Sequence, residues 1–301
     1  MAEMVPFFSR WRNHLIALFA GVLGSTLAQA PKEPPKSAGN GPASEKGPLL
    51  AFVCLNKDSD PAPDVLKQKV AAWLQLKGPE EVKKTDLSEK DDMEGVSFEV
   101  NGKNVMIVHA GFPIPKGDID YACQNAVLWP EAAKVLAKHK SHLVVTVFGN
   151  FPSPVEQGLF LSRVLAACTE VYDANSIYWG HATVVHKPDF FREQIRKADA
   201  RNLPVLAWVG FLRARGKEEG TFDLYTRGLN VFGVMEIEVV GTKRMPSEVF
   251  GRVSDLSSYL LTHGNVVQDG HTIGSDQNEK IRTRHADSVI GREGKVLRVE
   301  L

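Results

Sequence analysis

The stretch VSFEVNGKNVMIVH, residues 96–109, decides the fold class because it encodes a β-hairpin. Residues 96–100 and 105–109 are rich in β-branched and apolar side chains, and Asn101-Gly102 lies between them. Both turn residues tolerate the positive φ that a type I′ turn requires, so this dipeptide is a strong short-range hairpin signal. The stretch therefore predicts two paired antiparallel strands.

The segments on either side of this hairpin each predict a strand and a helix. Residues 49–55 form a continuous apolar run suited to a buried strand, and a helix that opens at Asp64 places its apolar residues on one face. Pro130 begins a helix through Ala137, and residues 142–148 form a run long enough for a central strand. The order βαββαβ is that of a ferredoxin-like sheet with helices on one face.

The second half of the chain repeats this mixture of elements. We expect helices at 154–172, from 188 and at 247–261, and strands at 176–179, 203–211, 221–226, 233–240, 280–284 and 295–301. The predicted fold is therefore α+β, with a ferredoxin-like first half and a similar second α+β half packed as one compact unit.

The amino-terminal region differs from the rest of the chain. Residues 1–28 have the order of a secretory signal, with Arg10 and Arg12 before an apolar run and small residues after it. Residues 29–47 hold four prolines and no large apolar side chain, which predicts a disordered linker. We expect a protein exported to the periplasm or cell envelope. The alternatives are an uncleaved anchor, or a start codon assigned too early on a cytoplasmic protein. Residues 48–301 form the predicted α+β domain, with lobes at 48–150 and 151–301.

Composition narrows the choice of partners. The chain has 301 residues, 43% of them hydrophobic and 24% charged, which is ordinary for a globular protein. Its 36 basic residues balance 36 acidic ones, so we expect no nucleic-acid partner. Basic residues such as Arg213 and Arg215, at a predicted hairpin tip, are interpreted as a solvated face. The three cysteines form no CxxC pair, and the sequence predicts neither a metal site nor a cofactor.

Three stretches supply the candidate ligand-binding residues, which are Trp179, His181, Glu236, Glu238, His271, Lys280 and Arg282. Residues 178–186 follow a strand, where sites often lie. Strand alternation places Glu236 and Glu238 on one face, where they either form an acid–base pair or face solvent. Lys280 and Arg282 alternate onto one face of a predicted strand, which suits an anionic group or a charged edge strand. For the first stretch, the alternative is that His181 and His186 are purely structural.

No motif of a common enzyme class is present in the sequence. It contains no Walker P-loop, no GxGxxG after the first strand, no GxSxG elbow and no HExxH. The leading hypothesis is therefore a non-catalytic binding or interaction module with a protein partner. The alternative is a hydrolase-type enzyme that uses Glu236 or Glu238 with His181 or His271 in a cleft between the lobes. A third hypothesis is an anion or nucleic-acid binder that uses the basic row at residues 280–284.

Several short blocks in order resemble one bacterial family, the domain of unknown function 4261. The blocks are Trp129-Pro130-Glu131-Ala132, His142-Leu143-Val144-Val145-Thr146-Val147, Ile177-Tyr178-Trp179-Gly180, Met235-Glu236-Ile237-Glu238 after Gly228, Gly270-His271-Thr272-Ile273-Gly274 and Glu279-Lys280-Ile281. The resemblance covers residues 48–301 and implies no activity. Two departures are the added amino-terminal segment and His271, which stands where the family pattern has an acidic residue.

Overall fold

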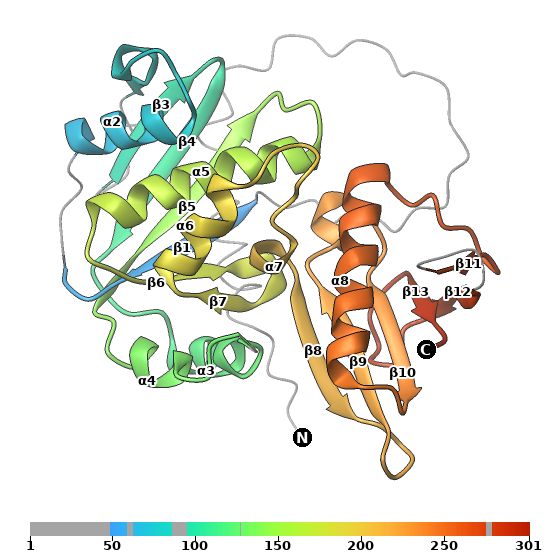
Figure 1. Ribbon diagram of the computed structural model, residues 1–301. Helices are drawn as coiled ribbons and strands as arrows, with labels where there is room; N and C mark the ends of the chain where they lie inside the picture. Colours follow the sequence, from blue (N-terminus) through green and yellow to red (C-terminus); the bar gives the residue numbers. More distant parts are fainter. Residues whose placement is uncertain (1–48, 59–62, 86–94, 127, 275–278) are drawn as a thin grey trace.

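The computed structural model describes residues 49–58, 63–85, 95–126, 128–274 and 279–301 (Figure 1). These residues form two β-sheets and seven α-helices, which confirms the predicted α+β class. The predicted export segment at 1–28 and the predicted linker at 29–47 lie outside the described residues. None of the helices in this described part is long and apolar enough to cross a lipid bilayer.

The first sheet has seven strands in the order β2-β3-β4-β5-β1-β6-β7, and each pair is antiparallel. Its strands are β1 (Leu50–Leu55), β2 (Lys83–Thr85), β3 (Gly95–Val100), β4 (Lys103–Ala110), β5 (Ser141–Gly149), β6 (Ala174–Trp179) and β7 (Val184–His186). The predicted hairpin is confirmed, because β3 pairs with β4 across the turn and φ is 51° at Asn101 and 71° at Gly102.

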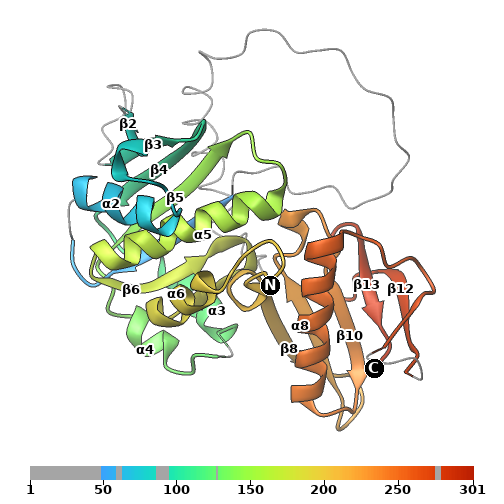
Figure 2. The same cartoon turned by 45° about the horizontal axis from the view of Figure 1, so that its top comes forward.

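Helices cover both faces of this first sheet (Figure 1 and Figure 2). Helices α2 (Pro63–Trp73), α5 (Pro154–Val171) and α6 (Pro188–Arg196) lie on one face, and α3 (Lys116–Gln124) and α4 (Ala132–Leu136) lie on the other. Along β1, Ala51, Val53 and Leu55 pack into one core, whereas Phe52 and Cys54 pack into the opposite one. A strand that is buried on both faces has a continuous apolar sequence, which explains the apolar run at residues 49–55.

The ferredoxin-like arrangement predicted for the first half is not confirmed. That arrangement would place β1 between β4 and β5, whereas β5 pairs with β4 on one side and with β1 on the other. The outer edge of β1 pairs instead with β6, which comes from the second half of the chain. The order of elements along a sequence does not determine which strands pair in the sheet. The prediction of helices on one face only was also wrong, because helices cover both faces.

The second sheet has six strands in the order β11-β12-β13-β10-β9-β8. Its strands are β8 (Gly210–Arg215), β9 (Phe222–Arg227), β10 (Ile237–Thr242), β11 (Thr272–Ile273), β12 (Ile281–Asp287) and β13 (Lys295–Val299). Helix α8 (Pro246–His263) covers one face, and its residues Val249, Val253 and Leu260 are buried. Ile237 and Val239 of β10 belong to the same core as these residues. The second sheet therefore has one apolar face beneath α8.

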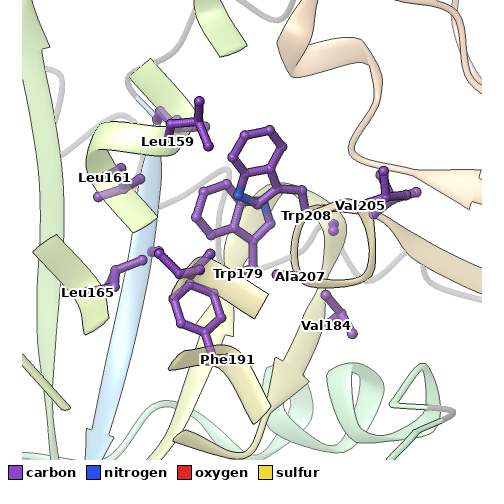
Figure 3. Close-up of a cluster of buried hydrophobic side chains, with 14 of the residues drawn as sticks. Leu159, Leu161, Leu165, Trp179, Val184, Phe191, Val205, Ala207 and Trp208 are labelled. Carbon is purple, nitrogen blue, oxygen red and sulfur yellow. The ribbon is translucent and has the colours of Figure 1, made fainter. Parts of the chain in front are cut away.

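The two sheets share one hydrophobic core. The chain passes from the first sheet to the second between His186 and Gly210, so β6 and β7 extend the first sheet beyond residue 150. Short helix α7 (Val205–Trp208) lies in this passage, where one strand at 203–211 was predicted. Trp208 stacks on Trp179 at 6.2 Å and on Phe232 at 4.8 Å, among leucines of α5 (Figure 3). This stack lies where the two sheets meet.

Candidate functional site

Glu236 is a buried carboxylate that positions the loop after β9. Its Oε1 accepts hydrogen bonds from the backbone N–H groups of Gly228, at 2.7 Å, and Asn230, at 3.3 Å. Its Oε2 accepts a hydrogen bond from Thr226 Oγ1 at 2.7 Å. Gly228 has φ +105°, and an added Cβ would lie 2.8 Å from the carbonyl oxygen of Trp208, so no side chain fits there. Glu236 thus fixes the backbone between β9 and the 3-10 helix η3 (Asn230–Phe232).

Glu238 is a fully buried carboxylate that positions the loop between β12 and β13. It accepts hydrogen bonds from Arg298 Nη2 at 2.9 Å, Ser288 Oγ at 2.6 Å and the backbone N–H of Val289 at 3.2 Å. Arg298 Nη2 also donates to the carbonyl oxygen of Asp287 at 3.0 Å. Glu236, just before β10, and Glu238, within it, are therefore both buried, and each accepts hydrogen bonds from its own set of protein donors.

A cleft of about 680 Å³ lies between the second sheet and the elements at the edge of the first sheet. One wall consists of β8, β9 and the segment from Ile290 to Val296. The opposite wall carries Tyr121 and Asn125, at the end of α3, and His181, in the 3-10 helix η2 (Gly180–Ala182). Its size falls within the range of small-molecule sites, about 300–1,000 Å³.

Four cationic side chains line this cleft, namely Arg213, Arg227, Arg292 and Lys295, and we call the hollow the cationic cleft. The carboxylates that line it are Glu236 and Glu293. Arg227 Nη1 donates to Tyr121 Oη at 3.3 Å, and its guanidinium lies 5.8 Å from the centre of that ring. Arg292 Nη1 donates to the carbonyl oxygen of Thr226 and lies 3.9 Å from Glu236 Oε2. Lys295 also pairs with Asp287 at 2.6 Å, so the cations that line the cleft outnumber its carboxylates, but one of them already has an anionic partner outside the lining.

Tyr225 also lines the cationic cleft, opposite Glu238 in the strand register. Burial, together with the nearby carboxylate of Asp223, raises the pKa of the Tyr225 hydroxyl above its ordinary value. Tyr225 Oη donates a hydrogen bond to Asp223 Oδ2 at 2.7 Å. The phenol therefore stays protonated near neutral pH, and it adds no negative charge to the cleft.

The structure brings together two of the sequence-predicted residues, His181 and Glu236, which both line the cationic cleft. Trp179 is two residues from His181 but lies fully buried in the core that joins the sheets (Figure 3). Glu238 is near Glu236 in sequence, but its carboxylate is enclosed by Arg298 and the β12–β13 loop. Only His181 and Glu236 are thus placed for contact with a ligand in this cleft.

His271 lies at a separate hollow of about 760 Å³, between α8 and the strands β11 and β12. It follows a turn in which Gly270 has φ +78° and Asp269 Oδ1 accepts a hydrogen bond from the backbone N–H of His285 at 2.8 Å. The carbonyl oxygen of His271 accepts hydrogen bonds from both N–H and Oγ1 of Thr283. His271 therefore anchors the start of β11 and does not line the cationic cleft.

Lys280 and Arg282 are exposed at the opposite end of the second sheet from β8. Strand β12 alternates as predicted, with Ile281 and Thr283 buried and Arg282 and Arg284 exposed. Arg284 forms an ion pair with Glu300 of the chain end. These cations therefore lie outside the lining of the cationic cleft. In the described part of the chain, no group of three histidine, cysteine, aspartate or glutamate side chains is arranged to hold a metal ion.

Most residues that line the cationic cleft were not predicted from the sequence. Arg227, Arg292, Lys295, Tyr121 and Asn125 were not selected, and Arg213 was interpreted as solvated. These residues come from segments separated by up to 174 positions, and each looks like an ordinary surface residue in its own segment. The one local signal was Glu236, selected with Glu238 as two carboxylates on the same face of a predicted strand.

Comparison with known proteins supports one relationship. The family model of a domain of unknown function (DUF4261) matches residues 225–300, so the resemblance is confirmed for this region, and the blocks between residues 129 and 180 lie outside the match. The matched region contains β10 to β13 and α8. It also contains Glu236, Arg227, Arg292 and Lys295 of the cationic cleft. No curated protein and no solved structure matches the chain.

Proposed function

We propose that the protein is a non-catalytic binding module that holds an anionic ligand in the cationic cleft. The observation that supports this function is the convergence of Arg213, Arg227, Arg292 and Lys295 on one hollow. Clefts lined by one sign of charge focus the electric field and concentrate ligands of opposite charge. Arginine presents up to five donors in a planar fork, which suits carboxylate and phosphate groups.

The cleft arginines keep donors for a ligand. The hydrogen bonds of Arg227 and Arg292 described above involve a single terminal nitrogen of each guanidinium. The remaining N–H groups of each fork are not used by those bonds. Arg213 projects from β8 and lies over the Phe222 ring at 5.0 Å, so its position is held by packing as well as by charge. An anion that enters the cleft would meet prepositioned cations.

The bonding of the two glutamates favours binding over catalysis. A general acid or base must exchange a proton with substrate, so it needs an accessible oxygen. Both oxygens of Glu236 accept hydrogen bonds from the loop that they position, and those of Glu238 accept from Arg298 and the β12–β13 loop. Strong donors to a carboxylate stabilise its ionised form and restrict its movement. This supports a structural role for both glutamates.

A second candidate function is a hydrolase-type enzyme that uses Glu236 with His181. One observation favours it, because both residues line the same cleft although they are 55 positions apart in the chain. In that case Glu236 would both position the loop after β9 and act as the acid or base in hydrolysis. Hydrolytic turnover that is lost in Glu236→Gln, while the variant stays folded, would replace the binding module with this enzyme.

The first test of the binding module is titration with inorganic phosphate, by calorimetry and by NMR, in a phosphate-free buffer of low ionic strength. We expect saturable binding that weakens as salt is added, because the contacts are ionic. Arg227→Gln should weaken it by about tenfold or more, since a hydrogen bond to a charged group contributes about 1.5–3 kcal/mol.

The matched control is Arg215→Gln, which removes an exposed arginine of the same sheet that does not line the cleft. It should bind phosphate as the unmodified protein does. Both variants need an unchanged urea midpoint before their affinities are compared. Absence of phosphate binding, or an equal loss in both variants, would contradict the proposal.

A further inference from the structure

A second, apolar hollow of about 210 Å³ lies next to the cationic cleft. Its lining includes Trp129, Phe190, Leu206, Phe211 and Phe250, and we call it the apolar pocket. At its mouth, Leu128 is 53% exposed. An exposed apolar hollow lined by aromatic side chains is typical of a ligand site. Without a ligand, these side chains leave apolar surface in contact with water.

The apolar pocket and the cationic cleft adjoin at two places. Asn125 lines both hollows, and its Nδ2 donates to the carbonyl oxygen of Thr183 at 3.3 Å. Strand β8 supplies Phe211 to the apolar pocket and Leu212 to the cationic cleft. The cationic cleft is lined by Leu212, Arg213 and Ala214 in succession, so both hollows lie along β8, which is the edge strand of the second sheet. A ligand that passes this edge can reach both compartments.

The pocket is suited to one ring-sized apolar group. An engineered apolar cavity of about 150 Å³ stays dry and binds benzene, so about 210 Å³ accommodates a phenyl ring. His186 in its wall donates from Nε2 to the carbonyl oxygen of Ala207 at 3.1 Å, and burial lowers its pKa to about 4. The imidazole is therefore neutral at pH 7 and does not oppose an apolar guest.

We infer that the ligand of this protein is an anion that carries an aromatic ring. The anionic group lies in the cationic cleft, the ring lies in the apolar pocket, and the connecting atoms pass Asn125. This inference rests on the proposed function and names the chemical class of its ligand. Lys187, whose ammonium lies 5.8 Å from the Trp129 ring centre, places a further cation at the wall of the apolar pocket.

The test compares three probes, which are inorganic phosphate, phenyl phosphate and 3-phenylpropyl phosphate, titrated into the full chain. At least one phenyl ester should bind about 10- to 100-fold more tightly than phosphate, because a buried ring removes a large apolar area from water. Two ester lengths are needed so that one of them spans the distance between the hollows.

Two variants of the apolar pocket and one variant of the cationic cleft show which hollow is responsible for the tighter binding of the phenyl esters. Leu206→Phe, which fills the apolar pocket, should abolish the gain from the ring and leave phosphate affinity unchanged. Leu128→Ser, at an exposed position, should lower the gain without any risk to folding. Arg227→Gln should weaken all three probes by the same factor.

The outcomes separate the two proposals. If phosphate binds but neither ester binds more tightly, or if the gain survives in both pocket variants, the aromatic ligand is wrong and the anion site stands. If the esters bind equally well to Arg227→Gln and to the unmodified protein, the apolar pocket acts alone and the two-compartment ligand is wrong. If no probe binds, the proposed function fails together with the inference.

Discussion

The two sheets differ in what covers their second face. Helices close both faces of the first sheet, and apolar residues alternate into two cores. The second sheet has α8 on one face, and on the other its carboxylates are held by arginine and by loop donors. The first sheet therefore gains stability from apolar burial, whereas the second sheet keeps a polar face on which charges are positioned.

This difference suggests a division of roles between the sheets. The polar face of the second sheet lies beside elements of the first sheet, and together they form the walls of the cationic cleft. The residues that position the cleft loops, Glu236 and Glu238, lie in the region that the DUF4261 family model matches. The cationic residues Arg227, Arg292 and Lys295 lie in it as well. The charged residues of the proposed site thus lie mainly in the second sheet and its loops.

The largest expected effect comes from breaking the buried ion pair of the second sheet. Arg298→Ala leaves Glu238 fully buried without its cation, and we expect a loss of about 3–5 kcal/mol in the free energy of unfolding. Chemical denaturation measures this loss. The double variant Glu238→Leu/Arg298→Met should recover most of it, because no unpaired charge remains in the interior.

The control for this variant is Arg284→Ala on the neighbouring strand, whose partner Glu300 is at the surface. An exposed ion pair contributes about 0–1 kcal/mol, so the control should change stability little. Equal losses of stability in Arg298→Ala and Arg284→Ala would show that the buried Glu238–Arg298 pair does not stabilise the polar face.

In the first sheet, a substitution that leaves a cavity in the apolar core should lower the free energy of unfolding. Leu165→Ala removes a fully buried side chain of α5 (Figure 3), and we expect a loss of about 2–5 kcal/mol. The loss should be the same at low and high salt, because no charge is involved. Val65→Ala on α2, at a side chain that is 49% exposed, is the control and should stay within about 0.5 kcal/mol. A loss that depends strongly on salt would break the comparison between the sheets.

Local patterns predicted the elements of the fold better than their pairing. Asn101-Gly102 fixed a hairpin because the turn and both strands lie within 14 consecutive residues. The neighbours of β1 come from residues 141–149 and 174–179, and no short-range pattern reports such distant contacts. The apolar run at 49–55 did contain the information that helices cover both faces, since a strand with one solvated face alternates.

The candidate site shows the same limit. Glu236 could be selected because strand alternation places it with Glu238 on one face, as a candidate acid–base pair. Its partners could not be predicted, because they are the Thr226 hydroxyl and the backbone N–H groups of Gly228 and Asn230, which only the folded loop brings to the carboxylate. Trp179 was selected for its place after a strand, but its indole ring serves the core between the sheets. Only the folded chain distinguishes such roles.

The smallest expected effect concerns the pH dependence of the first sheet. Burial lowers the pKa of His186 on β7 to about 4, against about 6.5 in an unfolded chain. Below pH 6.5 the unfolded chain therefore binds a proton that the folded protein does not bind until about pH 4. The stability from neutral His186 is complete above pH 6.5 and is lost as pH falls toward 4, by about 1–3 kcal/mol in total. In His186→Gln, which cannot titrate, the free energy of unfolding should fall less steeply across this window. Val65→Ala, which removes no titratable group, is the control and should keep the original slope. If both variants keep that slope, the buried histidine of the first sheet does not contribute to its acid sensitivity.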